Sequence, residues 1–453
     1  MSGSVGEQSE EVKSMVEEWN LARALMGGTF AMRAAGAAYL PQWPAEDSTV
    51  YQTRLATSVL FPAFARTVTT LAAKPFSKPV TLSEDMPEGL RQLTDDIDRQ
   101  GRNLGVFAGD LLTDALAYGL TGVLVDFPRT AGLRTRAEER SAGVRPYWVH
   151  VRPWQILGWR AEFRDSNWFF TQLRTMEIID EPDGDYATKA IKQVRVLEPG
   201  RWTTFREAGG NGWRVYEEGE SSLRYVPFVP IYGERIEFMH GRSPLLEIAH
   251  LNVAHWQESS DQRHLMRIAR VPVLVATGTD DIELVLGGSV AVKLPAGGDL
   301  KFVEHSGAAI GAGRQALEDL KEEMRQAGAE LLVLQPGKKT ATQVGAEQSV
   351  GMCALQEIAE TLEDALDRCL QITADWVGEP QAGSVSLFKD FGFANAREAS
   401  AQLIVTMASD RLISDETARA EMKRRGILAP EVDEATESKR LKARPAPDPR
   451  SAV

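Results

Sequence analysis

The amino-acid sequence predicts an α+β protein, in which a β-rich segment lies between two mainly helical segments. Apolar residues recur at helical spacing before residue 119 and again after residue 243, whereas residues 147–232 contain short β-rich runs separated by turn residues. Hydrophobic residues make up 43% and charged residues 25% of the 453 positions, close to globular averages. A chain of this length can bury the cores of about two or three structural units.

The first part of the chain is expected to hold amphipathic helices followed by a buried strand. Val12, Met15 and Trp19 begin a helical apolar pattern that stops at the glycine pair 27–28. Further helices are expected over residues 51–73 and 90–118, the first stopped by a proline and the second by a glycine. The apolar run at residues 121–128 ends in proline, a pattern typical of a buried strand.

Residues 147–232 are expected to form an antiparallel β unit. Turn sequences rich in proline, glycine, aspartate and asparagine lie at residues 182–184, 199–200 and 209–212. They separate short runs of aromatic and β-branched residues, which pack well on a pleated surface. This pattern predicts strands joined in sequence by tight turns.

Helices dominate the sequence again after residue 243. A helix over residues 243–270 is expected to open at Ser243-Pro244, a cap residue followed by proline. Strands are expected at residues 271–276, 291–294 and 300–304, and a helix at 314–334.

A long helix over residues 347–377 has the most regular pattern in the chain. Its apolar positions alternate spacings of three and four and form a seam: Met352, Leu355, Ala359, Leu362, Leu366, Cys369, Thr373 and Trp376. Carboxylates occupy the other side: Glu357, Glu360, Glu363, Asp364 and Asp367. This acidic side has two open interpretations, a solvated helix face or the wall of a channel that repels DNA.

The C-terminal part is expected to contain a strand, a helical pair and a flexible tail. The strand lies at residues 384–388, and the helices lie at residues 394–409 and 414–425, the second capped by Ser414. Residues 429–453 are rich in proline, alanine and charge, which predicts a flexible tail.

Charge and cysteine content narrow the class of protein. The net charge of −13 argues against a sequence-reading DNA binder, because an acidic surface repels phosphate, but it allows DNA to slide past. No signal peptide or membrane-spanning run is seen, so we expect a cytoplasmic protein without membrane contact. Cys353 and Cys369 are about 24 Å apart along one expected helix and are expected to be buried and unbridged.

No catalytic, metal or cofactor motif emerges from the sequence. His250, His255 and His264 lack the i, i+4 spacing of zinc-binding helices. The sequence around Lys338 and Lys339 lacks the glycine and hydroxyl positions of a phosphate-binding loop. The carboxylate pairs at 95–96 and 280–281 are better explained by helix starts than by a metal site. We therefore expect a protein that is not an enzyme and that holds no cofactor or metal.

Short motifs follow one another along most of the chain, none of them catalytic. They lie at residues 51–55, 68–76, 119–126, 153–156, 241–246, 254–264, 269–274, 295–298, 316–320, 340–342, 388–391 and 412–417. In number and order they resemble the portal proteins of tailed bacteriophages, the subunits of the ring that connects head and tail.

This resemblance implies a structural subunit of a homo-oligomeric ring, usually of about twelve copies, at a unique capsid vertex. Double-stranded DNA would pass through the channel without specific contact during packaging and ejection. The implied partners are the terminase large subunit, the major capsid and scaffolding proteins, and head-completion, adaptor and tail proteins. The ring would be assembled in the host bacterial cytoplasm and would end in the virion.

The resemblance also implies a division of the chain. The N-terminal arm and the body called the wing would occupy residues 1–313, and stem and clip residues 314–352, with the clip at about 335–346. The long helix and its return strand would occupy residues 353–391, the crown helices 392–428 and the flexible tail 429–453.

A few charged residues are candidates for channel or clip contacts on the same resemblance. They are Lys338, Lys339, Glu347, Glu357 and Glu360. For the two lysines a solvated loop is the commoner explanation. Two alternatives to a portal subunit stay open: another phage head or tail assembly protein, and a phage nuclease or peptidase.

Overall fold

The computed structural model describes residues 4–128, 144–207, 212–270, 273–277, 297–303, 308–335 and 352–389, together with 406, 414, 417, 418 and 422. Helices and strands are both abundant, which confirms the α+β prediction. The chain divides into two units, one of residues 1–331 with 354–387 and one of residues 332–353 with 388–453.

The N-terminal helices are shorter and more numerous than expected. They are α1 (Glu10–Met26), α2 (Gly28–Ala35), the 3-10 turn η1 (Gly36–Ala38), α3 (Ser48–Thr57), α4 (Ala63–Ala72) and α5 (Glu88–Leu93). Ser9 caps α1, and Val12, Met15 and Trp19 are buried as the pattern predicted. The helix expected over residues 51–73 is wrong as a single element, because α3 ends at Thr57 and the chain resumes its helical path only after Pro62.

A largely buried helix and a buried strand form the centre of the larger unit. Asn103 caps α6 (Leu104–Tyr118), since its side-chain oxygen accepts a hydrogen bond from the amide of Val106 at 2.9 Å. Gly119 ends α6 in the left-handed conformation with φ 80°, and a Cβ there would lie 2.2 Å from the backbone of Arg242. The next strand, β2 (Leu120–Asp126), is buried over nearly its whole length, which confirms the strand prediction.

Strand β2 is the central strand of an antiparallel three-stranded sheet. Its neighbours are β3 (Tyr147–Val151) and β9 (Phe228–Tyr232), in the order β3-β2-β9. Trp148 of β3 is buried; its ring lies edge-on to Phe107 of α6, and its indole N–H donates to the hydroxyl of Thr373 at 2.9 Å. The sheet is therefore covered by α6 and by the long helix α10 (Ala354–Val377).

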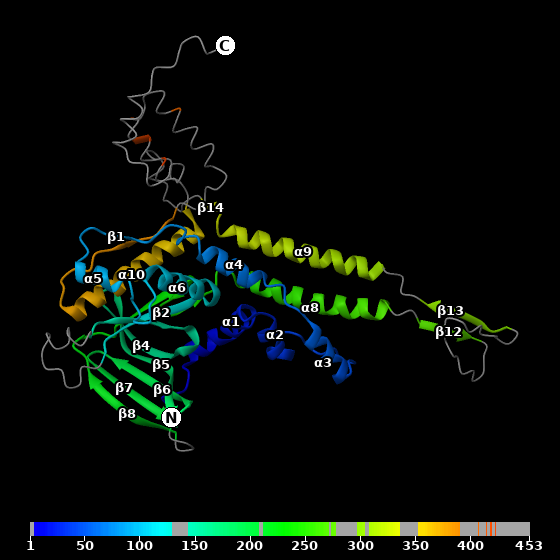
Figure 1. Cartoon of the computed structure of the whole chain (residues 1–453), viewed down its shortest axis with the longest axis horizontal. Helices are drawn as coiled ribbons and strands as arrows, with labels where there is room; N and C mark the ends of the chain where they lie inside the picture. The colour runs from blue at the N-terminus through cyan, green and yellow to red at the C-terminus, as the bar shows by residue number, and fades with distance from the viewer. Residues whose placement is uncertain are drawn as a thin grey trace, which may run out of the picture. The chain divides into compact units, whose positions relative to one another are not determined.

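The predicted antiparallel β unit is a five-stranded meander in the order β4-β5-β6-β7-β8 (Figure 1). The 3-10 turn η2 (Pro153–Gln155) leads into it, and its strands are β4 (Ile156–Arg164), β5 (Asn167–Asp183), β6 (Ala187–Glu198), β7 (Arg201–Glu207) and β8 (Trp213–Glu220). Each strand pairs with the next one along the chain. A small hairpin of β10 (Glu234–Glu237) and β11 (His240–Arg242) then leads to the helical part.

Two long helices run side by side and antiparallel (Figure 1). They are α8 (Leu246–Ala269) and α9 (Ala308–Glu330), and strands β12 (Val273–Thr277) and β13 (Asp299–Val303) pair between them in sequence. Gln262 of α8 donates to the carbonyl of Ile310 at 2.9 Å, and Gly328 lies beside Ile248, which fixes the antiparallel direction. We call residues 246–330 the helical arm.

The predicted start of α8 is two residues early. The helix is capped at Leu245 and not at Ser243. The Ser243 hydroxyl instead donates to the carbonyl of Leu116 at 2.6 Å and accepts from the amide of Leu245 at 3.1 Å. Ser243 thus joins the start of the helical arm to the end of α6.

The helices expected at 314–334 and 347–377 both have wrong boundaries. The first spans Ala308–Glu330, and the second begins at Ala354. Between them, β14 (Leu334–Gln335) pairs with β15 (Met352–Cys353), and this pairing takes the backbone hydrogen-bonding groups that a continuing helix would have used.

The remaining strands and the C-terminal part complete the described chain. Short strands β1 (Thr81–Leu82) and β16 (Val385–Ser386) pair antiparallel. The amide of Thr417 donates to the hydroxyl of Ser414 at 3.1 Å, which confirms the predicted cap. The expected crown and tail otherwise lie outside the described residues.

Candidate functional site

A buried arginine joins the N-terminal helices to the helical arm. The Arg54 side chain on α3 is 2% exposed and forms a two-pronged ion pair with Glu46, at 2.7 Å from Nε and 2.8 Å from Nη2. Its Nη1 atom lies 3.3 Å from the carboxylate of Asp261 on α8. The guanidinium also lies 4.1 Å from the centre of the Trp43 ring, so its charge is satisfied on every side.

The charges around Arg54 shift one another's protonation. The hydrogen bonds from Arg54 hold the pKa of Glu46 below its usual range, and the same bonds raise the pKa of Arg54. Burial raises the pKa of Asp261, and the attraction of Arg54 only partly offsets this effect. Glu46 is therefore the principal counter-ion, and Asp261 is a weaker second one.

Uncharged polar groups also hold α8 against residues 58–64. We call this contact region, together with the ion pairs of Arg54, the base of the helical arm. The hydroxyls of Ser58 and Ser260 are hydrogen-bonded at 2.8 Å. The fully buried amide of Asn252 accepts from the amide of Phe64 at 3.0 Å and donates to the carbonyl of Phe61 at 2.8 Å. These bonds hold the chain before α4 against α8, and they replace water that the buried backbone groups would otherwise need.

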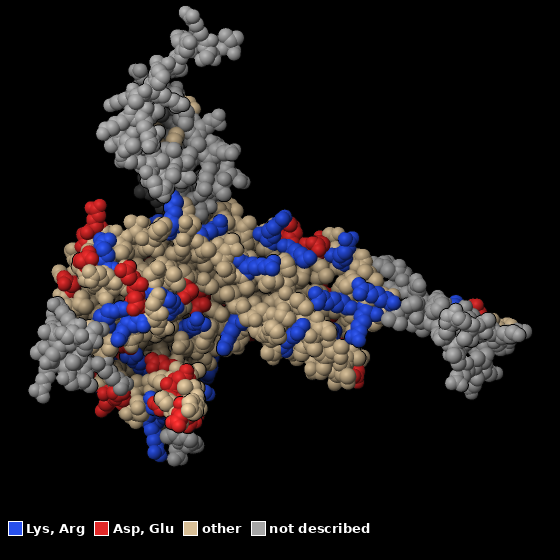
Figure 2. Space-filling model, viewed as in Figure 1, with Lys and Arg blue, Asp and Glu red and all other residues tan. Residues whose placement is uncertain are grey.

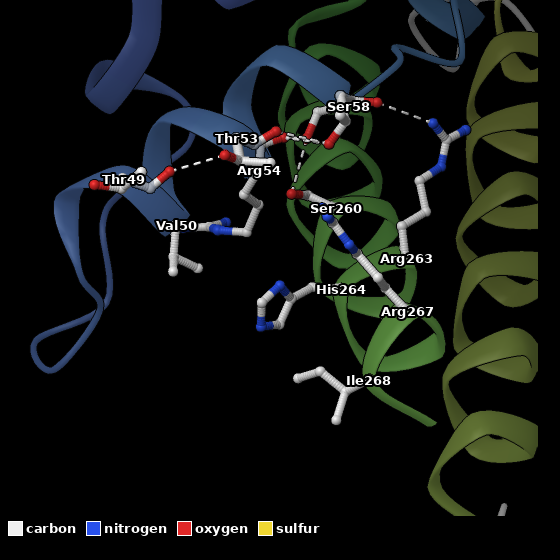
Figure 3. A pocket seen from close by; sticks show the side chains of 11 residues that line it. Thr49, Val50, Thr53, Arg54, Ser58, Ser260, Arg263, His264, Arg267 and Ile268 are labelled. Atoms are coloured by element: carbon white, nitrogen blue, oxygen red, sulfur yellow. Dashed lines mark hydrogen bonds between the residues drawn. The ribbon is translucent and has the colours of Figure 1, made fainter. Parts of the chain in front are cut away.

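A cavity of about 410 Å³ opens between α3 and α8 beside this ion pair (Figure 3). Its α8 wall carries Arg263, His264, Arg267 and Ile268, and its α3 wall carries threonines and Val50. The cations Arg263 and Arg267 are exposed, so this hollow is rimmed by positive charge. It contains hydroxyls but no arrangement of a nucleophile with a base among its lining residues.

A second, larger cavity of about 700 Å³ contains a buried charge cluster. Arg195 on β6 pairs with both oxygens of Asp126 on β2, at 2.7 and 2.8 Å, and lies 3.8 Å from Glu177 on β5. Burial raises the pKa of Glu177, with Arg195 opposing, and burial also raises the pKa of Tyr147 to about 12. Asp126 behaves differently: burial would raise its pKa, but the attraction of Arg195 brings the net shift below the usual value. The cluster thus joins β2 of the three-stranded sheet to β5 and β6 of the five-stranded sheet.

The long helix α10 carries the predicted seam and part of the predicted acidic side. Every seam position from Leu355 to Thr373 is buried, as the spacing indicated. Glu357 and Glu360 are exposed on the helix surface. Asp367 and Glu363, however, accept hydrogen bonds from the amides of Val385 and Leu387 at 2.7 and 2.5 Å. The acidic side is therefore divided, since two of its members hold the return strand.

The other candidate residues fall elsewhere. Lys338, Lys339 and Glu347 lie outside the described residues, as does the acidic pair 280–281. Asp96 accepts from the guanidinium of Arg145 at 2.8 Å and so has a structural role. Of the five predicted contact residues the structure describes two, Glu357 and Glu360, which share one helix.

Metal-ligand clusters, cysteines and long apolar helices were sought among the described residues. Within them, no three His, Cys, Asp or Glu side chains are grouped so as to hold a metal ion. Cys353 and Cys369 are buried and unbridged, as expected, and burial raises the pKa of the Cys369 thiol. None of the helices described is long and apolar enough to cross a membrane.

The main residues that sequence reasoning missed are Arg54, Glu46 and Asp261. Arg54 and Asp261 are separated by 207 positions, so no local spacing could pair them. The sequence offered no clear signal for them, because α3 and α8 mix polar and apolar residues on the faces that carry Arg54 and Asp261.

Comparisons with known proteins add a family match. A family model described as a domain of unknown function, DUF4055, matches residues 244–377, which contain the helical arm and α10. No curated protein matches the chain.

Solved structures that match the chain include chains of gene transfer agent (GTA) particles. A chain in the virion of a native particle matches with a TM-score of 0.43 and 13% identity, over 86% of this chain and 98% of that one. A chain in the neck of a native particle, computed with C12 symmetry, matches with a TM-score of 0.40 and 14% identity, over 86% and 98%. A chain in the neck of an empty particle, computed with C6 symmetry, matches with a TM-score of 0.41 and 13% identity, over 86% of this chain and 97% of that one. Values this low transfer no residue role to this chain.

Proposed function

We propose that the chain is a portal-type structural subunit of a phage-like particle, which forms a ring at one capsid vertex and catalyses no reaction. The order of motifs along the sequence suggested this class, and the helical arm is the observation that carries the proposal. Helices α8 and α9 run antiparallel to each other, and the strand pair of β12 and β13 lies between them in the sequence. Such an arm offers long faces for packing against neighbouring copies in a closed ring.

In this proposal the helical arm is the stem of the ring. The two stem helices would be α8 and α9, and residues 271–307 between them would form the clip. These boundaries differ from those expected from the sequence, which took residues 314–334 as a stem helix and 335–346 as the clip. The reason for the change is the contact between α8 and α9, which makes them the outgoing and returning halves of one element.

The charge of the chain fits a conduit for DNA. The net charge is −13, and α10 exposes Glu357 and Glu360. A channel wall of this sign repels phosphate, so DNA can move without a deep binding minimum. Lys338 and Lys339 are proposed to touch DNA or a partner outside the stem.

The proposed partners follow from this role. They are further copies of the chain, about twelve to a ring, and a terminase large subunit. Capsid, scaffolding, head-completion, adaptor and tail proteins would contact the ring, which would be assembled in a bacterial cytoplasm and end in the virion.

Electron microscopy of the purified full chain tests the proposal. Negative-stain images and light scattering should give rings of about twelve subunits with a central hole. A stable monomer or dimer at all salt concentrations would contradict a ring subunit.

A high-resolution reconstruction then tests the stem assignment separately. We expect α8 and α9 of adjacent copies to lie side by side around the hole. A ring in which the helical arm points away from the axis would disprove the stem assignment and leave the ring itself standing.

A further inference from the structure

A narrow crevice lies between the two helices of the arm, on the side of α8 that faces α9. Its volume is about 280 Å³, and its roof is the segment before α4, residues 59–62. His255, Ser259 and Arg263 line it from α8 at spacings of four residues, and Leu317 and Lys321 line it from α9 at the same spacing. We call this hollow the interhelical crevice.

The interhelical crevice combines an apolar lining from residues 59–62 and Leu317 with four polar side chains, all of which can donate hydrogen bonds. The imidazole, hydroxyl, guanidinium and ammonium groups of its walls all carry N–H or O–H bonds, and no carboxylate lines it. Such a set of groups matches an acceptor-rich ligand. The volume lies just below the range of about 300–1,000 Å³ of drug-sized pockets, so the ligand must be small.

His255 gives the second observation. Its side chain belongs to a residue that is only 5% exposed, and neither ring nitrogen has a hydrogen-bond partner among the described residues. Its one ring contact is with Phe61, at 5.3 Å between centroids. Buried polar groups are almost always hydrogen-bonded, so an imidazole in this state at the wall of a hollow points to a bound group.

The surrounding charges favour an anion. Burial lowers the pKa of His255, and Lys321 lowers it further, which keeps the imidazole neutral and able to donate from one nitrogen. Lys321 has one carboxylate partner, Glu318, at 2.8 Å, in an exposed i, i+3 pair of the kind that contributes little. Within the described residues, the hydrogen bond that Arg263 donates is a long one of 3.4 Å, to the carbonyl of Thr57. Figure 2 shows Lys and Arg gathered on the face over α8 and α9.

We propose that the interhelical crevice binds a phosphate group, held by Arg263 and Lys321 at its mouth and by His255 at its base. A tetrahedral oxyanion presents oxygens in several directions, and the donors that line the crevice come from two helices, His255 and Arg263 from α8 and Lys321 from α9. A carboxylate presents its two oxygens in one plane and would leave donors unpaired. The site stands whether or not the chain forms a ring.

Calorimetric titration of inorganic phosphate into the full-length protein tests the proposal. In chloride buffer at constant ionic strength, we expect saturable binding with one phosphate per chain. Lys321→Gln and Arg263→Gln should each weaken the affinity by about tenfold or more, because each removes a charge-assisted hydrogen bond. His255→Phe keeps the ring volume and removes the nitrogens, and it should weaken binding by a similar factor.

Arg267→Gln is the matched control. Arg267 is an exposed cation of the same helix, one turn beyond Arg263, and it lines the α3 cavity but not the interhelical crevice. Its phosphate affinity should stay within about twofold of the original. Absence of saturable binding, an equal loss in Arg267→Gln, or equally tight binding of acetate would overturn the proposal. If His255→Phe fails to fold, Lys321→Gln and Arg263→Gln still test the proposal, because neither of these side chains is buried.

A competition experiment identifies the source of the phosphate. If a blunt duplex oligonucleotide displaces inorganic phosphate from the original protein but not from Lys321→Gln, the bound group belongs to a nucleic-acid backbone. If phosphate binds unchanged in the presence of the duplex, the ligand is the free ion.

Discussion

The centre of the larger unit and the base of the helical arm are both buried, but different forces hold them. Around α6 and β2, residues such as Phe107, Leu111 and Val123 are fully buried and almost entirely apolar. At the base of the arm, Arg54 and Asn252 are equally inaccessible but are held by ion pairs and hydrogen bonds. The apolar centre gains stability from each buried methylene, whereas the polar base gains it only while every partner is present.

This difference teaches where the molecule is robust and where it is sensitive. Apolar substitution in the centre should cost free energy in proportion to the volume removed. Loss of one charge at the base should cost more than loss of both partners, because a single loss leaves a buried charge unpaired.

The largest effect is expected from Phe107→Ala. Phe107 is 0% exposed and packs edge-on against Trp148, so truncation should lower the free energy of unfolding by about 3–5 kcal/mol. Urea unfolding followed by tryptophan fluorescence measures the change. Val106→Ala, one residue away and 53% exposed, should stay within about 0.5 kcal/mol. Equal losses in the two variants would disprove the apolar-centre interpretation.

Arg54→Met should destabilise the base of the arm by about 3 kcal/mol, because Glu46, whose side chain is 1% exposed, loses its counter-ion. Hydrogen exchange should accelerate in α3 and α8 and stay unchanged in α6. The double variant Arg54→Met with Glu46→Gln should recover part of the loss. A double variant less stable than the single one would show that Glu46 is not the stranded charge.

Low pH should lower the local stability of the base of the helical arm, and the size of this effect should depend on Arg54. The folded-state pKa of Glu46 lies below its ordinary value of 4.5, so its stabilising contribution is fully present above pH 4.5 and is lost as the pH falls through the folded pKa. Hydrogen exchange of α3 measured between pH 6 and acidic values of about 3 should show this loss in the original protein. In Arg54→Met the dependence should be smaller, and an unchanged dependence would assign it to another group.

The smallest effects are expected on α10. Asp367→Ala should cost about 1 kcal/mol, because the carboxylate accepts a hydrogen bond from the amide of Val385 at 2.7 Å. Glu357→Ala, on the exposed surface of the same helix, should change stability by less than about 0.5 kcal/mol. Thermal unfolding compares the two, and equal costs would mean that the bond to the return strand adds no stability.

The pattern of the sequence was sufficient for elements whose burial is local and regular. The apolar positions of α1, the run of β2 and the seam of α10 were predicted because one buried face imposes a period on the side chains. Boundaries were less predictable. The end of α9 and the start of α10 depend on the pairing of β14 with β15, in which Leu334 pairs with Cys353 and Gln335 with Met352, 19 and 17 positions apart.

The candidate contact residues show the same difference between local pattern and distant contact. Glu357 and Glu360 were predicted as part of an acidic surface and are exposed, but nothing in the sequence separated them from Asp367 and Glu363, which bind the return strand. That distinction depends on where the chain returns after α10.

By itself, the sequence determined the α+β class, the principal buried faces and the acidic balance of this chain, because composition and period are local properties. Only the tertiary structure decided which polar groups meet. Arg54 reaches Asp261, and His255 faces the same crevice as Lys321, through contacts between helices far apart in the sequence. Such pairs depend on how whole elements pack, and the spacing of residues within one element carries no information about them.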